Sequence, residues 1–322
     1  MNKQLLANRF QIHYYFDDNS HSMDAIVRNR CEAEIIAILI EIAKTLNESV
    51  LIECEAHREG GLRDIWKLAN ANAGVISIII GIASIVVPLL PRSDSELDRL
   101  QKEDLRLSIE ERKLRIKLLK TEIESSNINY NTLAKAAEVV NENYKIITRR
   151  SNFFKHLNSY KKVFKVGVNS LTADDIESKP ESEITRNRFS RFILNSNSLP
   201  IQTVDEAVIE IVSPVLKQGN YKWKGIFDGE PISFIMKDNV FKQDVLSERI
   251  SFQHGSAIKC ALIIYRKLDE IGEIVTTGYA VETVIENISG YKNVETIQGR
   301  AYRHKRSLQN SQGDLFHDRE FS

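Results

Sequence analysis

The feature that most limits how this chain can fold is a run of 24 residues without a charge, from Leu68 to Pro91 (LANANAGVISIIIGIASIVVPLLP). Its apolar part, Gly74 to Leu90, approaches the roughly 20 residues that cross a bilayer core about 30 Å thick. Six Ile and three Val lie in this part, and it has no polar face beyond small residues. A helix buried on every side in a soluble bundle is the alternative. The sequence favours a transmembrane helix over residues 73–91.

Small residues form a stripe along this predicted helix. Gly74, Ser77, Gly81 and Ser84 recur at intervals of three, four and three, which places them on one helical face. Such a stripe lets membrane helices approach closely, or faces the lumen in a ring of subunits. Chance is the alternative, because Ile-rich spans often contain a few Gly and Ser. The stripe predicts helix packing or pore lining in a homo-oligomer.

The first 72 residues are expected to form a small β-α-β domain with a further short helix. The expected elements are a strand over Arg9–Phe16, a helix from Ser22 to about Leu46, a strand over Ser49–Glu55 and a helix over Leu62–Asn72. Together they make up domain 1–72.

A helical stalk is predicted over residues 92–170. The segment Leu97–Glu124 is dense in Leu, Ile, Lys, Arg and Glu, and a second helical stretch covers about Asn129–Thr148. The first contains a heptad seam of Leu105, Ile109, Arg112, Ile116, Leu119 and Ile123. The seam predicts either self-association in register or antiparallel packing of the two helices.

The C-terminal half changes character twice. Residues 171–202 are polar and predict a linker, and residues 203–300 show the pattern of a mainly-β domain. Gly219-Asn220 and Asp228-Gly229 are expected at hairpin turns. Residues 301–322 are expected to be a mobile tail. The predicted fold class is therefore an α+β membrane protein with one transmembrane helix.

A basic run between Tyr144 and Lys165 carries cations and aromatic rings in alternation. Five of its cations are candidates for binding a nucleotide or short oligonucleotide: Arg149, Arg150, Lys155, Lys161 and Lys162. Cations for phosphates and rings for base stacking are the pairing that binds single-stranded nucleic acid. Two alternatives stay open: an anionic membrane surface, or a solvated helix face whose rings are turned to a core.

Signs of catalysis are absent from the sequence. No Walker loop, GxSxG, HExxH or kinase motif occurs, and no HxxxH or DxD spacing marks a metal site. Cys31, Cys54 and Cys260 are far apart and odd in number, which indicates free thiols rather than a disulfide framework. Formal net charge is zero, so global charge indicates no class of partner. We expect no enzyme, no catalytic residue, no metal and no cofactor.

This organisation resembles the transmembrane effectors of bacterial anti-phage systems of the CBASS and Hailong types. The resemblance lies in the layout of one span beside soluble domains, and multi-span members of that group differ from it. It implies an oligomeric ion channel or pore in the bacterial inner membrane. It also implies control by a nucleotide or short oligonucleotide that a partner nucleotidyltransferase makes.

Three classes of function follow from the sequence. A ligand-gated channel uses the span, the stripe and the basic run together. A membrane-anchored scaffold or sensor uses the span and the stalk without a pore. A soluble nucleic-acid-binding protein requires that the apolar helix be internal.

Overall fold

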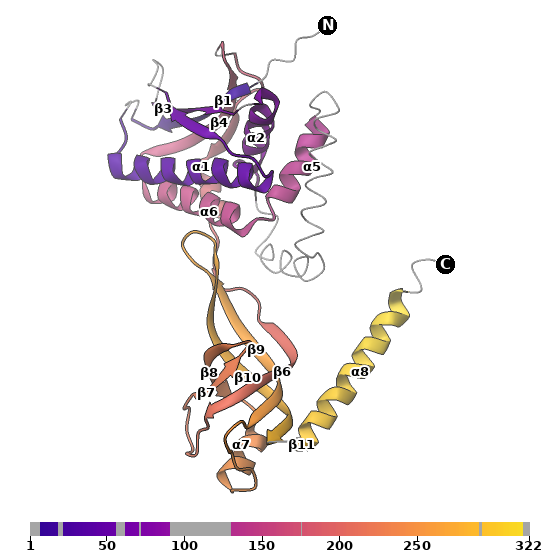
Figure 1. Ribbon diagram of the computed structural model, residues 1–322. Helices are drawn as coiled ribbons and strands as arrows, with labels where there is room; N and C mark the ends of the chain where they lie inside the picture. The colour runs from indigo at the N-terminus through magenta and orange to yellow at the C-terminus, as the bar shows by residue number, and fades with distance from the viewer. Residues whose placement is uncertain are drawn as a thin grey trace. The chain divides into compact units, whose positions relative to one another are not determined.

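The protein consists of two compact units, each with its own sheet and core (Figure 1). The computed structural model describes residues 7–18, 22–55, 62–70, 72–90, 130–174, 176–289 and 292–317. The first unit is Met1–Asn197 with Leu268–Ile274, and the second is Ser198–Lys267 with Val275–Ser322.

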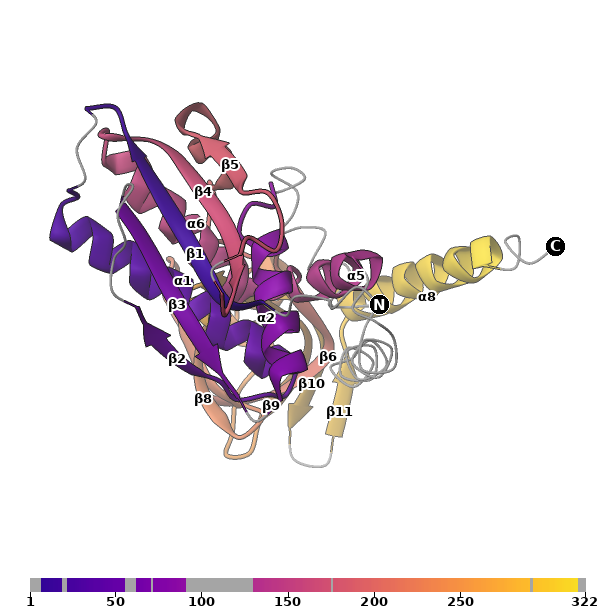
Figure 2. The same ribbon diagram turned by 90° about the horizontal axis from the view of Figure 1, so that it is seen from above.

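The first unit is built on a five-stranded antiparallel sheet in the order β2-β3-β1-β4-β5 (Figure 2). The strands are β1 (Ala7–Phe16), β2 (Leu51–Cys54), β3 (Leu62–Ala69), β4 (Val163–Thr172) and β5 (Ser182–Thr185). Because β3 lies between β1 and β2, the first β-α-β segment is split. This connectivity is that of the ferredoxin-like β-α-β-β-α-β motif, with β5 added at one edge.

Helices cover one face of this sheet. They are α1 (Ala25–Thr45), α2 (Ala73–Val86), α5 (Tyr130–Val140) and α6 (Tyr144–Ser159), and the short 3₁₀ helix η1 (Arg186–Phe192) follows β5. α1 packs along α6, and α2 packs against β1, β4 and α5. Phe10, Ile12 and Tyr14 alternate along β1 toward the helices and belong to the core. The side chains between them therefore point to the other face.

The expected helix over Leu62–Asn72 is the strand β3 instead. Asp64 on this strand is fully buried, and its Oδ1 accepts hydrogen bonds from Nε and Nη2 of Arg28 on α1, at 2.9 and 2.7 Å. A buried charge is stable only with such a partner. Because this partner lies on another element, the buried Asp64 interrupts the alternation of apolar residues by which a strand is recognised in the sequence.

The prediction of a transmembrane helix over 73–91, and with it a single-pass protein of the inner membrane, is wrong. Helix α2 has 14 residues, about 21 Å at the rise of an α-helix, against a bilayer core of roughly 30 Å. In the described parts of the chain, no helix is long and apolar enough to cross a membrane. The uncharged run is divided, because Leu68 and Ala69 end β3 and the helix begins at the Asn72 cap.

The apolar side chains of α2 lie in the core of the first unit. Ile79, Ile80, Ile82, Ala83 and Val86 are fully buried and belong to one cluster with β1 and α5. A helix without a polar face needs burial, and packing against the sheet and α5 buries most of it, while Gly74, Ser77, Gly81 and Ser84 are half-buried. The apolar helix therefore packs within the first unit, as a nucleic-acid-binding protein without a membrane span would require.

The predicted stalk is described only in part. The heptad seam from Leu105 to Ile123 lies outside the described residues. The second helical stretch forms α5 and α6, which pack in the first unit. Residues expected to form a linker over 171–202 contain the end of β4, then β5 and η1.

The second unit is a small β-barrel with an added edge strand. Its strands are β6 (Gln202–Ser213), β7 (Trp223–Phe227), β8 (Glu230–Met236), β9 (Ala257–Leu268), β10 (Ile274–Ser289) and β11 (Lys292–Glu295). Around the barrel the order is β6-β7-β8-β10-β9, and β9 pairs again with β6. β8 and β10 run parallel, whereas β6 is antiparallel to β7 and to β9, and β7 is antiparallel to β8. With helix α7 (Asn239–Leu246) between β8 and β9, this is the connectivity of an OB-fold.

Aromatic rings fill the barrel, and α7 closes one end of it (Figure 1). The ring centroid of Trp223 lies 6.2 Å from that of Phe234 and 6.3 Å from that of Phe241 on α7. Gly225 allows β7 to approach β6, since a β-carbon there would lie 2.6 Å from the Glu210 carbonyl oxygen. Asp228 and Gly229 form the expected two-residue turn, with φ of 52° and 79°.

A helix, α8 (Ile297–His317), occupies most of the segment expected to be a tail. Arg303 anchors it to the barrel through ion pairs to Glu206, Glu286 and Glu295 at 2.9, 2.5 and 3.0 Å. Hydrogen bonds to these carboxylates raise the pKa of Arg303. Glu286 and Glu295 lie on the strands just before the helix, whereas Glu206 lies 97 residues earlier, on β6.

Candidate functional site

Two charged surfaces of this protein lie on sheets, and the first is on the helix-free face of the first unit. We call it the sheet face; its cations are Arg9, Arg63, Lys67 and Lys165. Arg9 pairs with Glu55 at 2.8 Å, Lys67 with Glu53 at 3.6 Å, and Lys165 with Glu183 at 2.7 Å. Glu53 lies directly opposite Lys67 in the β2–β3 register, whereas Glu183 reaches Lys165 diagonally across β4 and β5 and Glu55 follows the end of β2. The sheet face thus neutralises its own charge.

A second surface, the lysine surface, lies on the barrel of the second unit. It consists of five lysines from the β6–β7 loop, β7, the end of β8 and α7: Lys217, Lys222, Lys224, Lys237 and Lys242. Trp223 points into the barrel, so alternation turns its neighbours Lys222 and Lys224 outward. Lys224 pairs in register with Ser233, and Trp223 with Phe234 near the end of β8. The lysines therefore gather toward one end of the β7–β8 hairpin.

Hydrogen bonds position two members of the lysine surface. Nζ of Lys242 donates to the carbonyl oxygen of Gly219 at 2.8 Å, which ties α7 to the β6–β7 loop. Nζ of Lys237 donates to the Tyr265 hydroxyl at 2.7 Å and lies 5.5 Å from the centroid of that ring. Within the described part of the chain, none of the five lysines makes an ion pair with a carboxylate. Their charge is therefore available to a partner.

Exposed apolar and aromatic side chains accompany these lysines. Tyr221 is 54% exposed beside Lys222, Ile235 is 42% exposed on β8, and Val240 is 57% exposed on α7. The acids of the hairpin, Asp228 and Glu230, lie at its opposite end, around the tight turn. Unpaired cations beside an exposed ring suit a ligand that carries phosphates and flat bases.

The cations predicted from the basic run are divided between the interior and the surface of the first unit. Arg149 pairs with Glu34 of α1 at 3.1 Å. Arg150 is 1% exposed and donates to the Val86 carbonyl at 3.1 Å and to Asn141 Oδ1 at 2.6 Å. Lys162 pairs with Asp18 at 3.0 Å, while Lys155 and Lys161 are exposed. The structure does not bring the five together as one open patch.

The rings of the basic run do not form an exposed stacking surface either. Phe153 and Phe154 are fully buried, and Phe154 stacks on Phe192 of η1 with centroids 4.0 Å apart. Tyr160 is half-buried, and Phe164 is 43% exposed. This placement matches the alternative in which the rings turn to a core.

All four residues of the small-residue stripe of α2 are half-buried in the first unit. A β-carbon on Gly81 would lie 3.0 Å from Cδ1 of Leu133, so α5 packs closely there. The Ser84 hydroxyl donates to the Ile80 carbonyl at 2.8 Å. Gly74 and Ser77 are half-buried near the start of the helix. At Gly81 the stripe thus meets a helix of the same chain.

The side chains that could ligate a metal ion are scattered in the described segments. No group of three or more His, Cys, Asp or Glu in the described segments could hold a metal ion. The cysteines are free, as expected. Burial raises the pKa of Cys260 to about 12 and also raises that of Cys31, so both thiols stay protonated at neutral pH.

Sequence reasoning missed the lysine surface because it treated residues 203–300 only as strands. A signal was present: Lys222 and Lys224 flank Trp223, the alternation of a strand with a ring inside and cations outside. What the sequence does not reveal is that these lysines make no ion pair with a carboxylate in the described residues. That depends on register and on the fold of the barrel.

Comparison with known proteins found no matching family model, no matching curated protein and no matching solved structure. Function is therefore inferred from the chemistry of the two surfaces.

Proposed function

We propose that this protein binds single-stranded nucleic acid through the lysine surface of its barrel. The observation that carries the proposal is the set of five barrel lysines without an ion pair in the described residues. OB-folds bind oligonucleotides on the face of their second and third strands and at the loop between the first two. In this barrel those positions are β7, β8 and the β6–β7 loop, which carry Lys222, Lys224 and Lys217.

Each part of the surface has a role in this proposal. The lysines neutralise phosphates and release counterions, which supplies most of the affinity without reading sequence. Tyr221 offers a face on which a base can stack. Ile235 and Val240 extend the contact to apolar parts of the ligand. We therefore expect binding that tolerates many base sequences and weakens strongly as the salt concentration rises.

The channel and the anti-phage role stay predictions. A pore was inferred from a membrane-spanning helix, and α2 is too short for that. The third functional class of the sequence analysis, binding of nucleic acid with an internal apolar helix, is the one that the proposal develops.

The test is fluorescence anisotropy with a labelled oligothymidine about 12 nucleotides long, within the roughly 4–16 nucleotides that one OB-fold covers. Log affinity should fall with log salt concentration, with a slope of about −0.7 for each phosphate neutralised. The double variant Lys222→Glu/Lys224→Glu should bind about tenfold more weakly or worse, with a slope shallower by about 1.4.

The matched control is Lys292→Glu, an exposed lysine on the edge strand β11 of the same unit. It should bind like the parent protein, because it lies outside the lysine surface. Equal affinity in the parent, the double variant and the control would contradict the proposal. So would an affinity that does not change with salt.

A further inference from the structure

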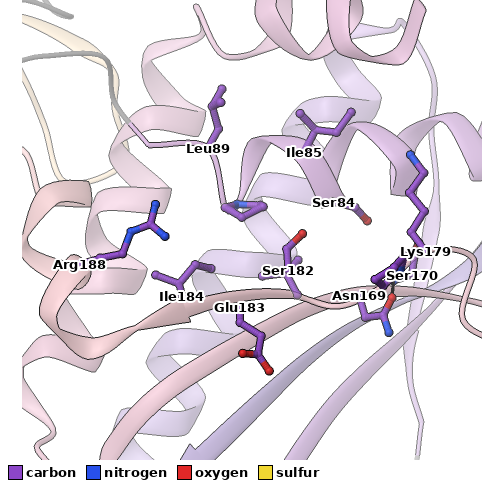
Figure 3. A pocket seen from close by; sticks show the side chains of 13 residues that line it. Ser84, Ile85, Leu89, Asn169, Ser170, Lys179, Ser182, Glu183, Ile184 and Arg188 are labelled. Carbon is purple, nitrogen blue, oxygen red and sulfur yellow. Dashed lines mark hydrogen bonds between the residues drawn. The ribbon is translucent and has the colours of Figure 1, made fainter. Parts of the chain in front are cut away.

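A cavity of about 560 Å³ in the first unit has a lining whose polar groups are mostly engaged within the chain (Figure 3). The Ser84 hydroxyl donates to the Ile80 carbonyl at 2.8 Å. Glu183 pairs with Lys165 at 2.7 Å, and Lys179 also has an interaction partner. The cavity therefore indicates no class of ligand. The outer face of helix α8, in the second unit, is different.

Helix α8 follows β11 and is attached to the barrel by polar contacts (Figure 1). Arg303 makes the three ion pairs described above, and Arg306 pairs with Asp205 of β6. A β-carbon on Gly299 would overlap the carbonyl group of Ile285 on β10. The side of α8 that carries Gly299, Arg303 and Arg306 therefore faces the barrel.

The opposite side of α8 carries apolar residues. Ile297, Ala301 and Leu308 follow one another at intervals of four and seven, which places them along one line of an α-helix. Ile297 is 87% exposed, Leu308 is 53% exposed, and Ala301 is exposed between them. We call these three residues the outer stripe. A surface helix normally turns its apolar side to its own core, so α8 is amphipathic in the reverse sense.

Basic side chains border the outer stripe. His304 and Lys305 come three and four residues after Ala301, so they lie on the two sides of the stripe. Both are exposed, and within the described segments neither makes an ion pair. Arg300 extends the border on the His304 side, and its side chain is 78% exposed although it pairs with Glu295 at 3.3 Å. The outer stripe is thus an apolar seam with a basic border.

We infer that the outer stripe of α8 docks an amphipathic helix of a partner protein, whose own apolar seam is bordered by Asp and Glu. Helices pair through apolar seams at these intervals, and the charges beside the seam select the partner. A second copy of α8 is a poorer partner, because it would bring one basic border against another. The polar contacts with the barrel keep the seam turned outward. This surface is separate from the lysine surface, so the inference does not depend on the proposed function.

The test is fluorescence anisotropy of the full chain with two labelled synthetic helices. Each has about 20 residues, enough to form a helix alone, and carries leucines at the spacing of the outer stripe. The acidic probe has glutamates on both borders of its seam, and the basic probe has lysines there. The acidic probe should bind at least about tenfold more tightly than the basic probe. Equal affinity for the two probes, or binding of neither, would overturn the inference.

Leu308→Asp should weaken binding of the acidic probe by about tenfold or more, because it places an acid in the seam. The matched control is Ile201→Asp. Ile201 is 55% exposed in the same unit, but it precedes β6 and is not part of α8. Circular dichroism shows whether both variants are folded. Equal affinity in the two folded variants would contradict the inference, since the outer stripe would then not meet the probe.

Reversal of one border charge tests the selectivity. Lys305→Glu should weaken the acidic probe and strengthen the basic one, so that the ratio of the two affinities falls by about threefold or more. Lys292→Glu, on β11, should leave this ratio unchanged. An unchanged ratio in Lys305→Glu would show that the basic border does not select the partner, and the inference would fail.

Two other occupants of the outer stripe are tested with the same variant. Sedimentation velocity tests a second copy of the chain, and flotation with vesicles that contain phosphatidylserine tests an anionic lipid surface. Neither measurement should differ between the parent protein and Leu308→Asp. Self-association or vesicle binding that is lost in Leu308→Asp would assign the stripe to that occupant and overturn the inference.

Discussion

The sheet face and the lysine surface are both charged sheet surfaces, yet only one of them leaves its cations unpaired. On the sheet face, Arg9, Lys67 and Lys165 each form an ion pair with a glutamate. On the barrel, the acids of the β7–β8 hairpin are at its turn, and the lysines are at its other end. Composition does not separate the two surfaces, but register does. A count of cations therefore does not locate a polyanion site.

The largest expected effect tests whether the units that carry the two surfaces have independent hydrophobic cores. Trp223→Ala should destabilise the barrel by about 3–5 kcal/mol, because it empties the centre of a packed aromatic cluster. Hydrogen exchange should show lost protection in β6–β10 and retained protection in β1–β4. Equal loss of protection in both units would show that the sheet face and the lysine surface belong to one cooperative fold.

The next effect compares an exposed ring on each surface. Tyr221→Ala should weaken oligothymidine binding by about 1–3 kcal/mol, the range for one stacked base. Phe164→Ala is the control, since Phe164 is 43% exposed beside the sheet face. Anisotropy measures both. A larger loss in Phe164→Ala than in Tyr221→Ala would move the binding site to the first unit.

A smaller effect should come from unpairing the sheet face. Glu53→Gln/Glu55→Gln leaves Lys67 and Arg9 without the carboxylates that they now contact at 3.6 and 2.8 Å. The protein should then gain weak, salt-sensitive oligothymidine binding, with a salt slope steeper by up to about 1.4. Both glutamate substitutions are made in the Lys222→Glu/Lys224→Glu protein, so that binding by the lysine surface is already weakened. No gain on that background would show that pairing is not what keeps the sheet face inactive.

The smallest effect concerns Glu181, whose carboxylate lies over Gly167 and accepts a hydrogen bond from Tyr15. Burial would raise the pKa of Glu181, but hydrogen bonds from His13 and Tyr15 lower it below its usual 4.5. Its contribution to folding is therefore complete above about pH 4.5 and is lost as pH falls through the lowered pKa. Glu181→Gln should remove this acid-sensitive part, about 1 kcal/mol or less. Urea titrations across that range, with Glu183→Gln for comparison, measure it.

Local patterns predicted several elements of this fold well. The first strand, the long helix after it, and the Asp228-Gly229 turn were all expected from nearby residues. Each is determined by alternation, a cap or turn chemistry within a few positions. Errors arose where distant residues decide the structure.

Two examples show that limit. Asp64 makes β3 resemble a helix because its partner Arg28 is on another element. The Ile-rich helix resembles a membrane span because the groups that bury it, β1 and α5, are not adjacent to it in sequence. The candidate sites follow the same rule. The unpaired lysines depend on strand pairing, which no local pattern encodes, and so does the position of Glu181 over Gly167.

The closure of the barrel has a consequence for how the protein reaches its native state. Gln202 pairs with Ile264, although two strands and a helix lie between them in the chain. The first and fourth barrel strands meet only after that long loop has been ordered, and non-local pairing of this kind slows folding. Until then, the edges of β6 and β9 are open to strands of other molecules. Refolding yield should therefore fall as protein concentration rises, and nascent chains should need protection until β9 has been synthesised.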